Sequence, residues 1–381
     1  MSLLLLCWGC SMDLEIWVRN KDSNMRYEVD SVADLFTSII ITENYYSANT
    51  FELVVPLTPE NVIRYIPDTL VRADGVFYFV DDVSVANEES GILSVSGKSL
   101  SGKYEDRIID PPINLNDTPQ KIVQALFTNY MIRPSDNKRK YEYLSIESVD
   151  VGDFPDAKIT YQSSYATIKD AVETICKTYD FGFKETAKVL ENGIMFDPMN
   201  VITLYRGEDK ASWVEISKHF ETLLNESYKN SIADYKTTAR VFGEGEGSSR
   251  TNITIGNDFS GVDRKELYVD ARDLQKAGEN GAPGMSDEAY RALLTNRGNE
   301  KLGDQQRILS INGGINIRST LYEIGKDYGL GDTVTLTSPL YALEGQFPIV
   351  SLKKTWDTTG EYIDTSFGIE ANTIFQILNR K

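Results

Sequence analysis

The chain has 381 residues, of which 41% are hydrophobic, and a formal net charge of −18 from 57 acidic and 39 basic side chains. This length predicts roughly two to four domains with real hydrophobic cores. The acidic balance argues against nucleic-acid binding by phosphate neutralisation and against docking on anionic lipid, and its simplest interpretation is a soluble acidic surface.

Residues 1–11 (MSLLLLCWGCS) carry no strand, cap or turn pattern. Their apolar run is short, no Lys or Arg precedes it and no small-residue cleavage site follows, so a signal peptide is not indicated. Cys7 and Cys10 have the spacing of a redox motif but lack its strand–helix context. We therefore interpret residues 1–11 as a non-native or disordered extension that assembly does not need. No apolar stretch reaches the roughly 18 residues of a membrane span.

Ordered structure is predicted to begin after Met12, where one short strand follows another. The segments are rich in β-branched and aromatic residues and are separated by Asn, Asp, Gly and Ser. They read LEIWVR, MRYEV, FTSIIIT, FELVVP, FYFVDDVSV and ILSVSG. Six strands within about 85 residues predict a small barrel or sandwich.

The last of these strands runs into Gly97-Lys98-Ser99, which looks like the end of a phosphate-binding loop. Such a loop needs a glycine five positions before Gly97, where Ile92 stands instead. Residues 92–96 alternate between apolar and polar, as a half-buried strand does. We therefore expect Ser96–Ser99 to end a strand and start a crossover helix, with Lys98 exposed and no nucleotide bound.

Helical periodicity follows in residues 115–132, with Asn116 or Asp117 as the cap and Pro119 in the first turn. A second helix is predicted over residues 165–182, with Cys176 on its apolar face and Gly182 near its end. Strands are expected next in FGFKETAKV, GIMFD and VITLYRG. This middle third is α/β in character.

Strands return from about Trp213, and a third helix is predicted to open at Ser286 after a Gly-rich loop. The loop GEGEGSS at 243–249 is expected at a hairpin tip. It misses the dinucleotide fingerprint because Ser248 stands where the third glycine should be. The predicted strands are WVEIS, FETLLNESY, YKTTARVFGEG, RILSINGGINIR, DTVTLT, FPIVSLKKTW and EYIDTSFG.

Candidate catalytic and metal-binding residues are few. His219 is the single histidine, which excludes His-cluster metal sites, and its alternating segment favours a surface position on a strand. Residues 256–266 fail the register of a calcium loop. Nucleophile-elbow, zinc-protease and Cys/His signatures are absent from the sequence, and paired carboxylates mean little in so acidic a chain. We expect no catalytic, cofactor-binding or metal-binding residues and no enzyme activity. The chain has three cysteines, and an odd number without a disulfide framework is typical of a protein in a reducing compartment.

Four segments together resemble the baseplate-hub and tail-tip hub proteins of long-tailed bacteriophages, which often form the N-terminal part of tail-associated lysins. The segments are SGKSLSGKYEDRIID after a strand, FTSIIITENYYSANTFELVVP, SYATIKDAVETICKTYDFGFK, and IGKDYGLGDTVTL with Tyr328, Leu330, Gly331, Asp332 and Val334. The resemblance spans residues 12–370.

The resemblance implies a β-rich α+β multidomain fold with two small β-barrels, an α/β domain and a helical insertion. The first barrel is expected over 12–110, the α/β domain over 111–205 and the second barrel over 206–370. The helical insertion falls at about 257–306 and a C-terminal tail at 371–381. Independently of the resemblance, the Leu-Gly-Asp before the strand DTVTLT predicts a tight turn at Gly331 and Asp332 that sets the register of that strand; if Gly331 has φ > 0, any side chain there is strained.

The resemblance also implies a structural role in the tail tip or baseplate of a virion, for a protein made in the host cytoplasm. Such hubs are homotrimers whose two similar barrels alternate around a pseudo-sixfold ring. The ring joins a hexameric tail tube or distal tail protein to a threefold fibre, spike or lysin, contacts the tape measure protein and lets DNA pass. Membrane binding is not implied, and a lytic or receptor-binding part is expected on another protein. Acidic groups along the channel would repel phosphate and keep DNA from binding in transit.

Two alternatives stay open. The first is a carbohydrate-binding β module of the tail tip, for which Tyr45 and Tyr46 are the candidate aromatic platform, against core or interface packing of the same pair. The second is a cryptic cell-wall hydrolase that uses paired carboxylates.

Overall fold

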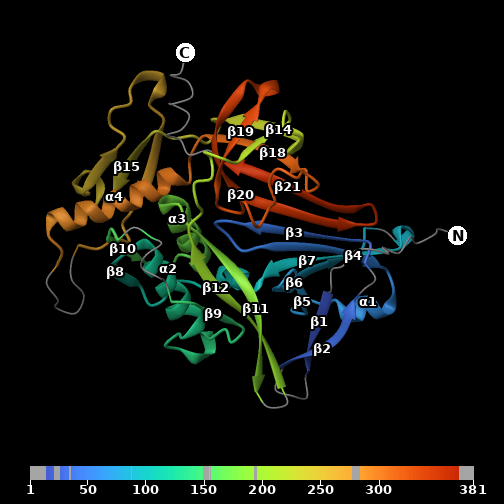
Figure 1. The fold of residues 1–381 in the computed structure, drawn as a ribbon. Coiled ribbons are helices and arrows are strands. Elements are labelled where there is room, and N and C mark those ends of the chain that lie inside the picture. The colour runs from blue at the N-terminus through green and yellow to red at the C-terminus, as the bar shows by residue number, and fades with distance from the viewer. Residues whose placement is uncertain are drawn as a thin grey trace.

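The computed structural model describes residues 14–20, 26–33, 36–86, 88–148, 154, 156–192, 195–276 and 284–368. The predicted extension 1–11, with Cys7 and Cys10, and the tail 371–381 lie outside these ranges. Four sheets and four α-helices make up the described part of the chain (Figure 1).

The largest sheet has 13 strands, which come from both ends of the sequence. Its N-terminal strands are β1 (Leu14–Asn20), β2 (Arg26–Ala33), β3 (Ser38–Asn44), β4 (Thr50–Pro56), β5 (Leu70–Ala73), β6 (Val76–Ser84) and β7 (Ile92–Ser99). Its C-terminal strands are β13 (Glu215–Ser217), β14 (Leu223–Ser231), β18 (Ile308–Ile315), β19 (Thr333–Ser338), β20 (Leu343–Asp357) and β21 (Gly360–Gly368). The main path is β14-β18-β21-β20-β3-β4-β7-β6-β5-β1-β2, with β19 on β20 and β13 on β19.

The strand β20 joins the two halves. It has 15 residues: its first part pairs with β19, and its second part pairs with β21 on one side and with β3 on the other. The expectation of two separate barrels is therefore wrong: the strands in the described residues follow an open path, and none of their sheets closes on itself. Because β20 is long, one of its edges is free to pair with β3, and this pairing links the two halves. The sheet keeps β14 and β2 as its two open ends.

The middle of the chain combines two helices with two small sheets. Strands β8 (Ile113–Asp117) and β10 (Ile159–Ser163) pair with each other, and β9 (Leu144–Ile146) extends the long hairpin of β11 (Gly182–Asn192) and β12 (Met195–Tyr205). The helices are α2 (Pro119–Phe127), continued by a π-helical turn at Thr128–Ile132, and α3 (Ile168–Tyr179). Both predicted helices are confirmed in these elements.

The helix ends differ from the prediction by one or two residues. Thr118, not Asn116 or Asp117, is the cap residue of α2, and the carboxylate of Asp117 instead accepts from the N–H of Thr118 at 2.9 Å. At the other helix, α3 ends on Asp180 with φ 51° rather than at Gly182. Asp tolerates this left-handed conformation, which explains how the helix can end before the glycine.

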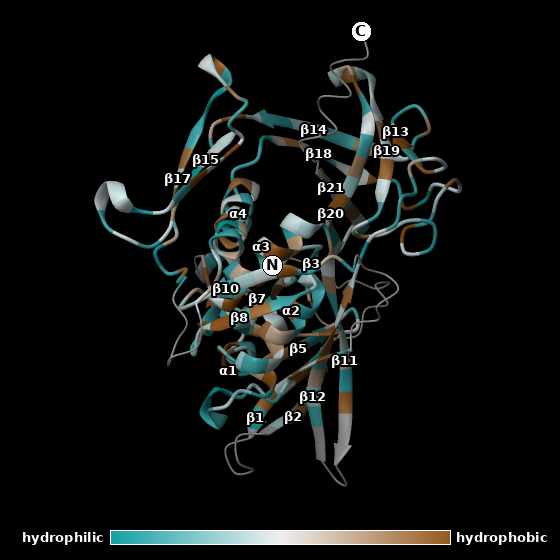
Figure 2. Ribbon diagram, turned by 90° about the vertical axis from the view of Figure 1, so that its left-hand side faces the viewer, coloured by the Kyte–Doolittle hydropathy of each residue, from teal (hydrophilic) through white to brown (hydrophobic). Residues whose placement is uncertain are grey.

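A small unit inserted between β14 and β18 has its own sheet and helix. Strand β15 (Thr238–Phe242) lies between β16 (Asn252–Ile255) and β17 (Glu266–Asp270), and α4 (Asp287–Gly303) covers them. Ser286 caps α4 as predicted, accepting from the N–H of Ala289 at 3.1 Å. Strands β15 and β16 precede the range 257–306 expected for the insertion, yet they pair with β17 and not with the large sheet. Helix α4 also packs on α3 and β10 (Figures 1 and 2).

Apolar side chains gather in four clusters, of which the central one is shared between strands of the N-terminal sheet, such as β6 with Phe77, and the middle of the chain. The N-terminal half of the large sheet buries Ile39, Phe51 and Val95, and the C-terminal half buries Phe347 and Phe367. The helices α2 and α3 turn their predicted apolar stripes into the central cluster, where Cys176 is fully buried. Full burial stabilises the folded state by about 1.5–3 kcal/mol for each large aliphatic or aromatic side chain, so each cluster contributes substantially to stability.

Candidate functional site: the sheet junction and the open surfaces

The Gly97-Lys98-Ser99 segment ends a strand, as predicted. β7 stops at Ser99, and a short helix, η2 (Leu100–Asp106), starts at the next residue. Gly97 lies under the backbone of β6, where an added Cβ would come within 1.9 Å of the Phe79 carbonyl oxygen. The segment is therefore packed against a neighbouring strand and has no room to wrap a phosphate.

Lys98 is only about one-third exposed, which corrects the expectation of a free surface lysine. Its ammonium donates to the carboxylate of Glu105, which also meets Lys169 at 3.5 Å. Burial raises the pKa of Glu105, but the hydrogen bond and charge of Lys98 outweigh it and hold the pKa below its ordinary value. Lys98 thus ties the last turn of η2 to the end of β7.

The single histidine and the described cysteine stand apart from any polar cluster. His219 is exposed in the turn after β13, not on a strand, and its ring lies 5.2 Å from that of Phe220. Cys176 is fully buried on α3, where burial raises the pKa of its thiol. Within the described ranges, no group of three or more His, Cys, Asp and Glu side chains is arranged to hold a metal ion.

Tyr45 stands at the junction between the two halves of the large sheet and the hairpin β11–β12. Its side chain is buried, and its hydroxyl accepts from the N–H of Gly207 at 2.9 Å. The rings of Tyr46 and Tyr205 lie 4.7 and 5.4 Å away. Tyr46 is half-buried and donates from its hydroxyl to Asp180 at 3.0 Å. The pair packs a junction, and this burial removes the aromatic platform that the carbohydrate alternative required.

Close approach of backbone makes this junction possible. A Cβ on Gly331 would lie 2.4 Å from the Tyr45 ring, and one on Gly182 would lie 2.2 Å from the Tyr45 carbonyl oxygen. A Cβ on Gly207 would lie 1.9 Å from the carbonyl oxygen of Gly331. Three segments therefore meet around one tyrosine because each presents a glycine.

The predicted turn at Gly331 and Asp332 is confirmed. Gly331 has φ 92°, in the region that favours glycine. The carboxylate of Asp332 accepts from the N–H of Glu208 at 2.7 Å and from the N–H of Gly329 at 2.9 Å. The turn thereby fixes the start of β19 and ties it to the chain segment that enters the C-terminal half.

A buried carboxylate that the sequence analysis did not single out joins the N-terminal sheet to the hairpin β11–β12. Glu185 is fully enclosed and accepts from the N–H and hydroxyl of Ser101 at 3.1 and 2.6 Å and from Asn200 at 2.7 Å. Asn200 also exchanges two hydrogen bonds with the backbone of Phe77, at 2.9 and 2.8 Å. Burial raises the pKa of Glu185, and these bonds partly offset that rise. Glu185 lies between Phe183 and Ala187 on the same face of a strand. This alternation could have predicted from the sequence that its carboxylate is buried.

A second buried acid lies in a cavity of about 270 Å³ between α3, β10 and α4. Burial raises the pKa of Glu300 to about 7. Arg297 lies 3.9 Å from that carboxylate and pairs more closely with Asp273, at 2.9 Å. Residues 293, 297 and 300 share one face of α4. A charged pair on an otherwise apolar helix face could have predicted this buried acid from the sequence.

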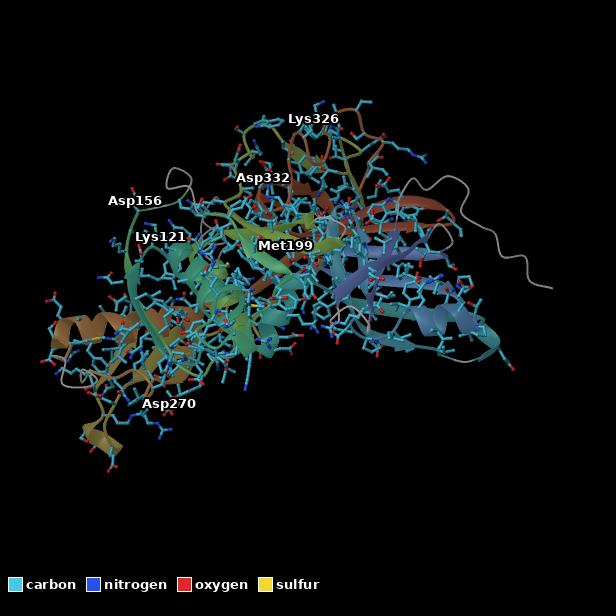
Figure 3. All side chains as sticks on the ribbon, turned by 90° about the horizontal axis from the view of Figure 1, so that it is seen from below. Lys121, Asp156, Met199, Asp270, Lys326 and Asp332 are labelled. Atoms are coloured by element: carbon cyan, nitrogen blue, oxygen red, sulfur yellow. The ribbon has the colours of Figure 1, made fainter. Side chains whose placement is uncertain are left out.

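The charged side chains spread over the surface rather than converging on one point (Figure 3). Asp270 marks the small inserted unit, far across the molecule from Asp332 and Lys326 (Figure 3). Arg272 and Arg250 pair with Asp270 at 2.6 and 2.8 Å, and the hydrogen bond from Arg272 lowers the pKa of Asp270 to about 2. The pair with Arg272 is exposed and stabilises the folded state only slightly, whereas the Arg250 side chain is mostly buried.

Two exposed apolar surfaces are candidates for contact with other proteins. Helix α1 (Pro59–Arg64) buries none of its residues, and Ile63 is 75% exposed beside a groove of about 590 Å³. On the C-terminal half, Leu224 and Tyr228 of β14 are exposed, and the Tyr228 ring stacks on Tyr341, the neighbour of the exposed Leu340, at 5.0 Å. Patches of this kind on a folded protein are typical of contact surfaces. None of the helices in the described residues combines the length and apolar composition of a membrane span.

The arrangement defines a β-rich protein of one large open sheet with smaller α- and β-containing parts, and two solved structures share this fold. A tail protein from Neisseria meningitidis MC58 is 11% identical with a TM-score of 0.52, over 94% of this chain and 97% of that one. The 43 kDa tail protein of prophage MuSo2 from Shewanella oneidensis is 11% identical with a TM-score of 0.51, over 93% and 97%. The chain belongs to the family of Siphovirus ReqiPepy6 Gp37-like proteins, which matches residues 14–369. Among curated proteins no match is found. The resemblance to phage tail proteins is thus confirmed.

Proposed function

We propose that the protein is the structural hub of a phage tail tip or baseplate, a homotrimeric ring in which two similar β units of each chain alternate. The observation that carries this proposal is the order of strands in the large sheet. The path β3-β4-β7-β6-β5 in the N-terminal half has the same sequence of neighbours as β14-β18-β21-β20-β19 in the C-terminal half. A chain with two equivalent units and two open sheet ends is suited to head-to-tail contacts that close into a ring.

Such a ring matches two symmetries at once. Six β units from three chains would face a hexameric tail tube or distal tail protein, and the threefold arrangement of the chains would receive a fibre, spike or lysin. The tape measure protein and DNA would occupy the channel. Three copies would carry three times the formal charge of −18, and acidic groups along a channel repel phosphate.

Three of the four apolar clusters support a division of the chain close to the expected one, and the central cluster joins the first two units. The N-terminal hub unit would take residues 12–110, the α/β unit 111–205 and the C-terminal hub unit 206–370. The small sheet of β15, β16 and β17 with α4 would be the insertion within the last unit. Its position beside α3 and β10 suits a peripheral contact rather than a part in the ring.

Light scattering on the purified chain tests the oligomer directly. The proposal expects a species of three times the chain mass across a range of protein concentrations. A monomer at the highest concentrations, or a twofold assembly, would contradict it. The carbohydrate alternative gains no support from the buried Tyr45, and the hydrolase alternative gains none from Glu185, whose carboxylate is held by Ser101 and Asn200.

A further inference from the structure

The two halves of the large sheet correspond residue by residue, not only strand by strand. The ladder β6–β7 shifts register between Val80 and Asp82, and the ladder β20–β21 shifts between Ile349 and Ser351. Val80 donates to the carbonyl of Thr69 at 2.8 Å, and Ile349 donates to that of Asp332 at 2.9 Å. Val80 and Ile349 therefore occupy equivalent positions.

The residues before β5 and β19 extend this equivalence. The N–H of Asp68 donates to Val80 at 2.9 Å, and the N–H of Gly331 donates to Ile349 at 2.7 Å. Both donors are left-handed, with φ 69° at Asp68 and 92° at Gly331. Two hydrogen bonds and one unusual backbone conformation recur at the same place in each half, so the correspondence sets a common register.

The same register reaches the outer strands. Phe51 pairs with Gly97 and Ile41 in the N-terminal half, and Ile311 pairs with Phe367 and Tyr228 in the C-terminal half. Because Gly97 and Phe367 lie opposite the equivalent Val80 and Ile349, Tyr228 is the counterpart of Ile41. Strand β14 is thus the counterpart of β3, and β6 is the counterpart of β20.

Within one chain the halves meet through β3 and β20. Asn44 pairs with Ser351, and Ile41 pairs with Lys354. The N–H of Tyr45 extends the ladder by donating to the carbonyl of Val350 at 3.0 Å. The counterparts of these two edges, on β14 and at the end of β6, have no such partner in the described residues. Strand β14 pairs only with β18, and the end of β6 beyond Val80 pairs only with β7.

The two unpaired edges carry exposed apolar side chains. Tyr228 on β14 is 40% exposed, and its ring stacks on Tyr341 of the same chain at 5.0 Å. Ile232 and Val85, the residues that directly follow β14 and β6, are 50% and 38% exposed. They also carry opposite charges, since Lys229 lies on β14 and Asp82 on β6, and neither forms an ion pair within the described residues. An exposed edge with a row of free backbone groups is a template for pairing with another strand.

We infer that β14 of one copy pairs antiparallel with the end of β6 of the next copy, as β3 pairs with β20 inside the chain. The equivalence gives the register: Ser231 opposite Asp82, Asn230 opposite Val83, Lys229 opposite Ser84 and Tyr228 opposite Val85. This contact rests on the proposed hub function and supplies its partner surface. Each copy offers one edge of each kind, so the contact is head-to-tail and closes when the rotation returns to the first copy.

The register has physical consequences that favour it. Tyr228 and Val85 would form a cross-strand aromatic–β-branched pair, which stabilises antiparallel strands. Lys229 would lie diagonal to Asp82 on the same face, within reach of its long side chain. The shift of one residue in either direction would separate both pairs onto opposite faces.

Disulfide trapping tests the register. In a background of Cys7→Ser and Cys10→Ser, the variant with Tyr228→Cys and Val85→Cys should oxidise to a covalent trimer on a non-reducing gel, because directly opposed strand residues have the Cα separation that a disulfide needs. The matched control joins Tyr228→Cys with Ser84→Cys, whose side chains face opposite sides of the sheet. It should remain monomeric on the same gel.

A charge exchange tests the same contact without cysteines. Lys229→Asp and Asp82→Lys should each reduce the fraction of trimer seen by light scattering at low salt, and the double variant should restore it. Unchanged trimer in both single variants would contradict the contact.

The outcomes separate the contact from the hub function. A trimer by light scattering that gives no cross-link in the Tyr228/Val85 variant would leave the hub function standing and overturn the register. A monomer that gives no cross-link would overturn both. A ladder of cross-linked bands beyond the trimer would support the strand pairing and contradict a closed ring of three.

Discussion

The aromatic ring of Tyr45 lies directly against Gly331: a Cβ built on Gly331 would come within 2.4 Å of it. Gly331 also has φ 92°, so it combines a close contact with a backbone conformation that other residues rarely adopt. This contact joins the start of β19 to the segment that leaves β3. The junction of the two halves therefore requires a residue without a side chain at position 331.

Gly331→Ala should therefore lower the free energy of unfolding by about 2 kcal/mol or more, since backbone strain adds to overpacking against the ring. Urea unfolding followed by fluorescence measures the change. The control is Gly329→Ala, two residues earlier, where an added Cβ meets nothing within 4 Å and φ is not left-handed. Equal stability of the two variants would show that the Tyr45 ring can move away from an added Cβ at position 331 at no cost in free energy.

Removal of the Glu185 carboxylate should be more damaging. Glu185→Ala leaves the donors of Ser101 and Asn200 unpaired in a buried site and opens a cavity, so we expect a loss of about 3–5 kcal/mol. Glu185→Gln keeps the volume and one acceptor oxygen, and it should lose about 1–2 kcal/mol. Chemical denaturation of both variants measures the difference, and a Glu185→Ala variant as stable as Glu185→Gln would mean that the network contributes little.

Lys98→Ala should reduce stability by at most about 1 kcal/mol, because the ion pair with Glu105 is partly exposed and exposed pairs contribute little. The variant should bind ATP no differently from the parent chain in calorimetry, with no saturable heat in either. Saturable binding in the parent that disappears in the variant would revive the phosphate-loop interpretation of this segment.

The contact of α4 with α3 and β10 should weaken as the pH rises. Because the pKa of Glu300 is raised to about 7 from the ordinary 4.5, its protonated form is favoured in the folded state. This contribution is fully present below about pH 4.5 and is lost as the pH rises through 7, by an amount on the order of 3 kcal/mol.

The groups that face Glu300 are Arg297, Lys301, Asp304 and Asp273, of which the two basic residues limit the rise. Thermal unfolding of the parent, Glu300→Gln and the exposed control Glu288→Gln between pH 5 and 8 isolates the effect. Glu300→Gln should flatten the pH dependence, whereas Glu288→Gln should retain it. Parallel curves for all three proteins would rule out a raised pKa at Glu300.

Duplex DNA should not be retained by the assembled protein. The net charge of −18 per chain repels phosphates, so electrophoretic mobility of DNA should be unchanged even at about 50 mM salt, where electrostatic binding is strong. Binding that falls steeply with added salt would point to a basic channel and would remove the role proposed for the acidic residues.

Local patterns in the sequence were sufficient for most individual elements. Alternation in residues 92–99 predicted β7 and its end at Gly97-Lys98-Ser99, and apolar spacing predicted α2, α3 and α4. These features depend on neighbours a few residues apart, which a strand or helix period records directly. Gly331 could be predicted for the same reason, since a Leu-Gly-Asp before a strand needs a left-handed turn residue.

Contacts between distant segments could not be predicted in the same way. The pairing of β3 with β20, which merges the halves into one open sheet instead of two barrels, joins residues such as Ile41 and Lys354 that no local period relates. The burial of Tyr45 and the partial burial of Lys98 likewise depend on Gly207, Gly331 and Glu105 reaching them in space. Sequence alone therefore determined most strands and three of the four described α-helices, because side-chain periodicity is local, whereas the short strands β5, β8, β9, β10, β16 and β17 and the short helix α1 were not predicted. Only the tertiary structure decided which edges pair and which stay open, because register is fixed by packing between segments hundreds of residues apart.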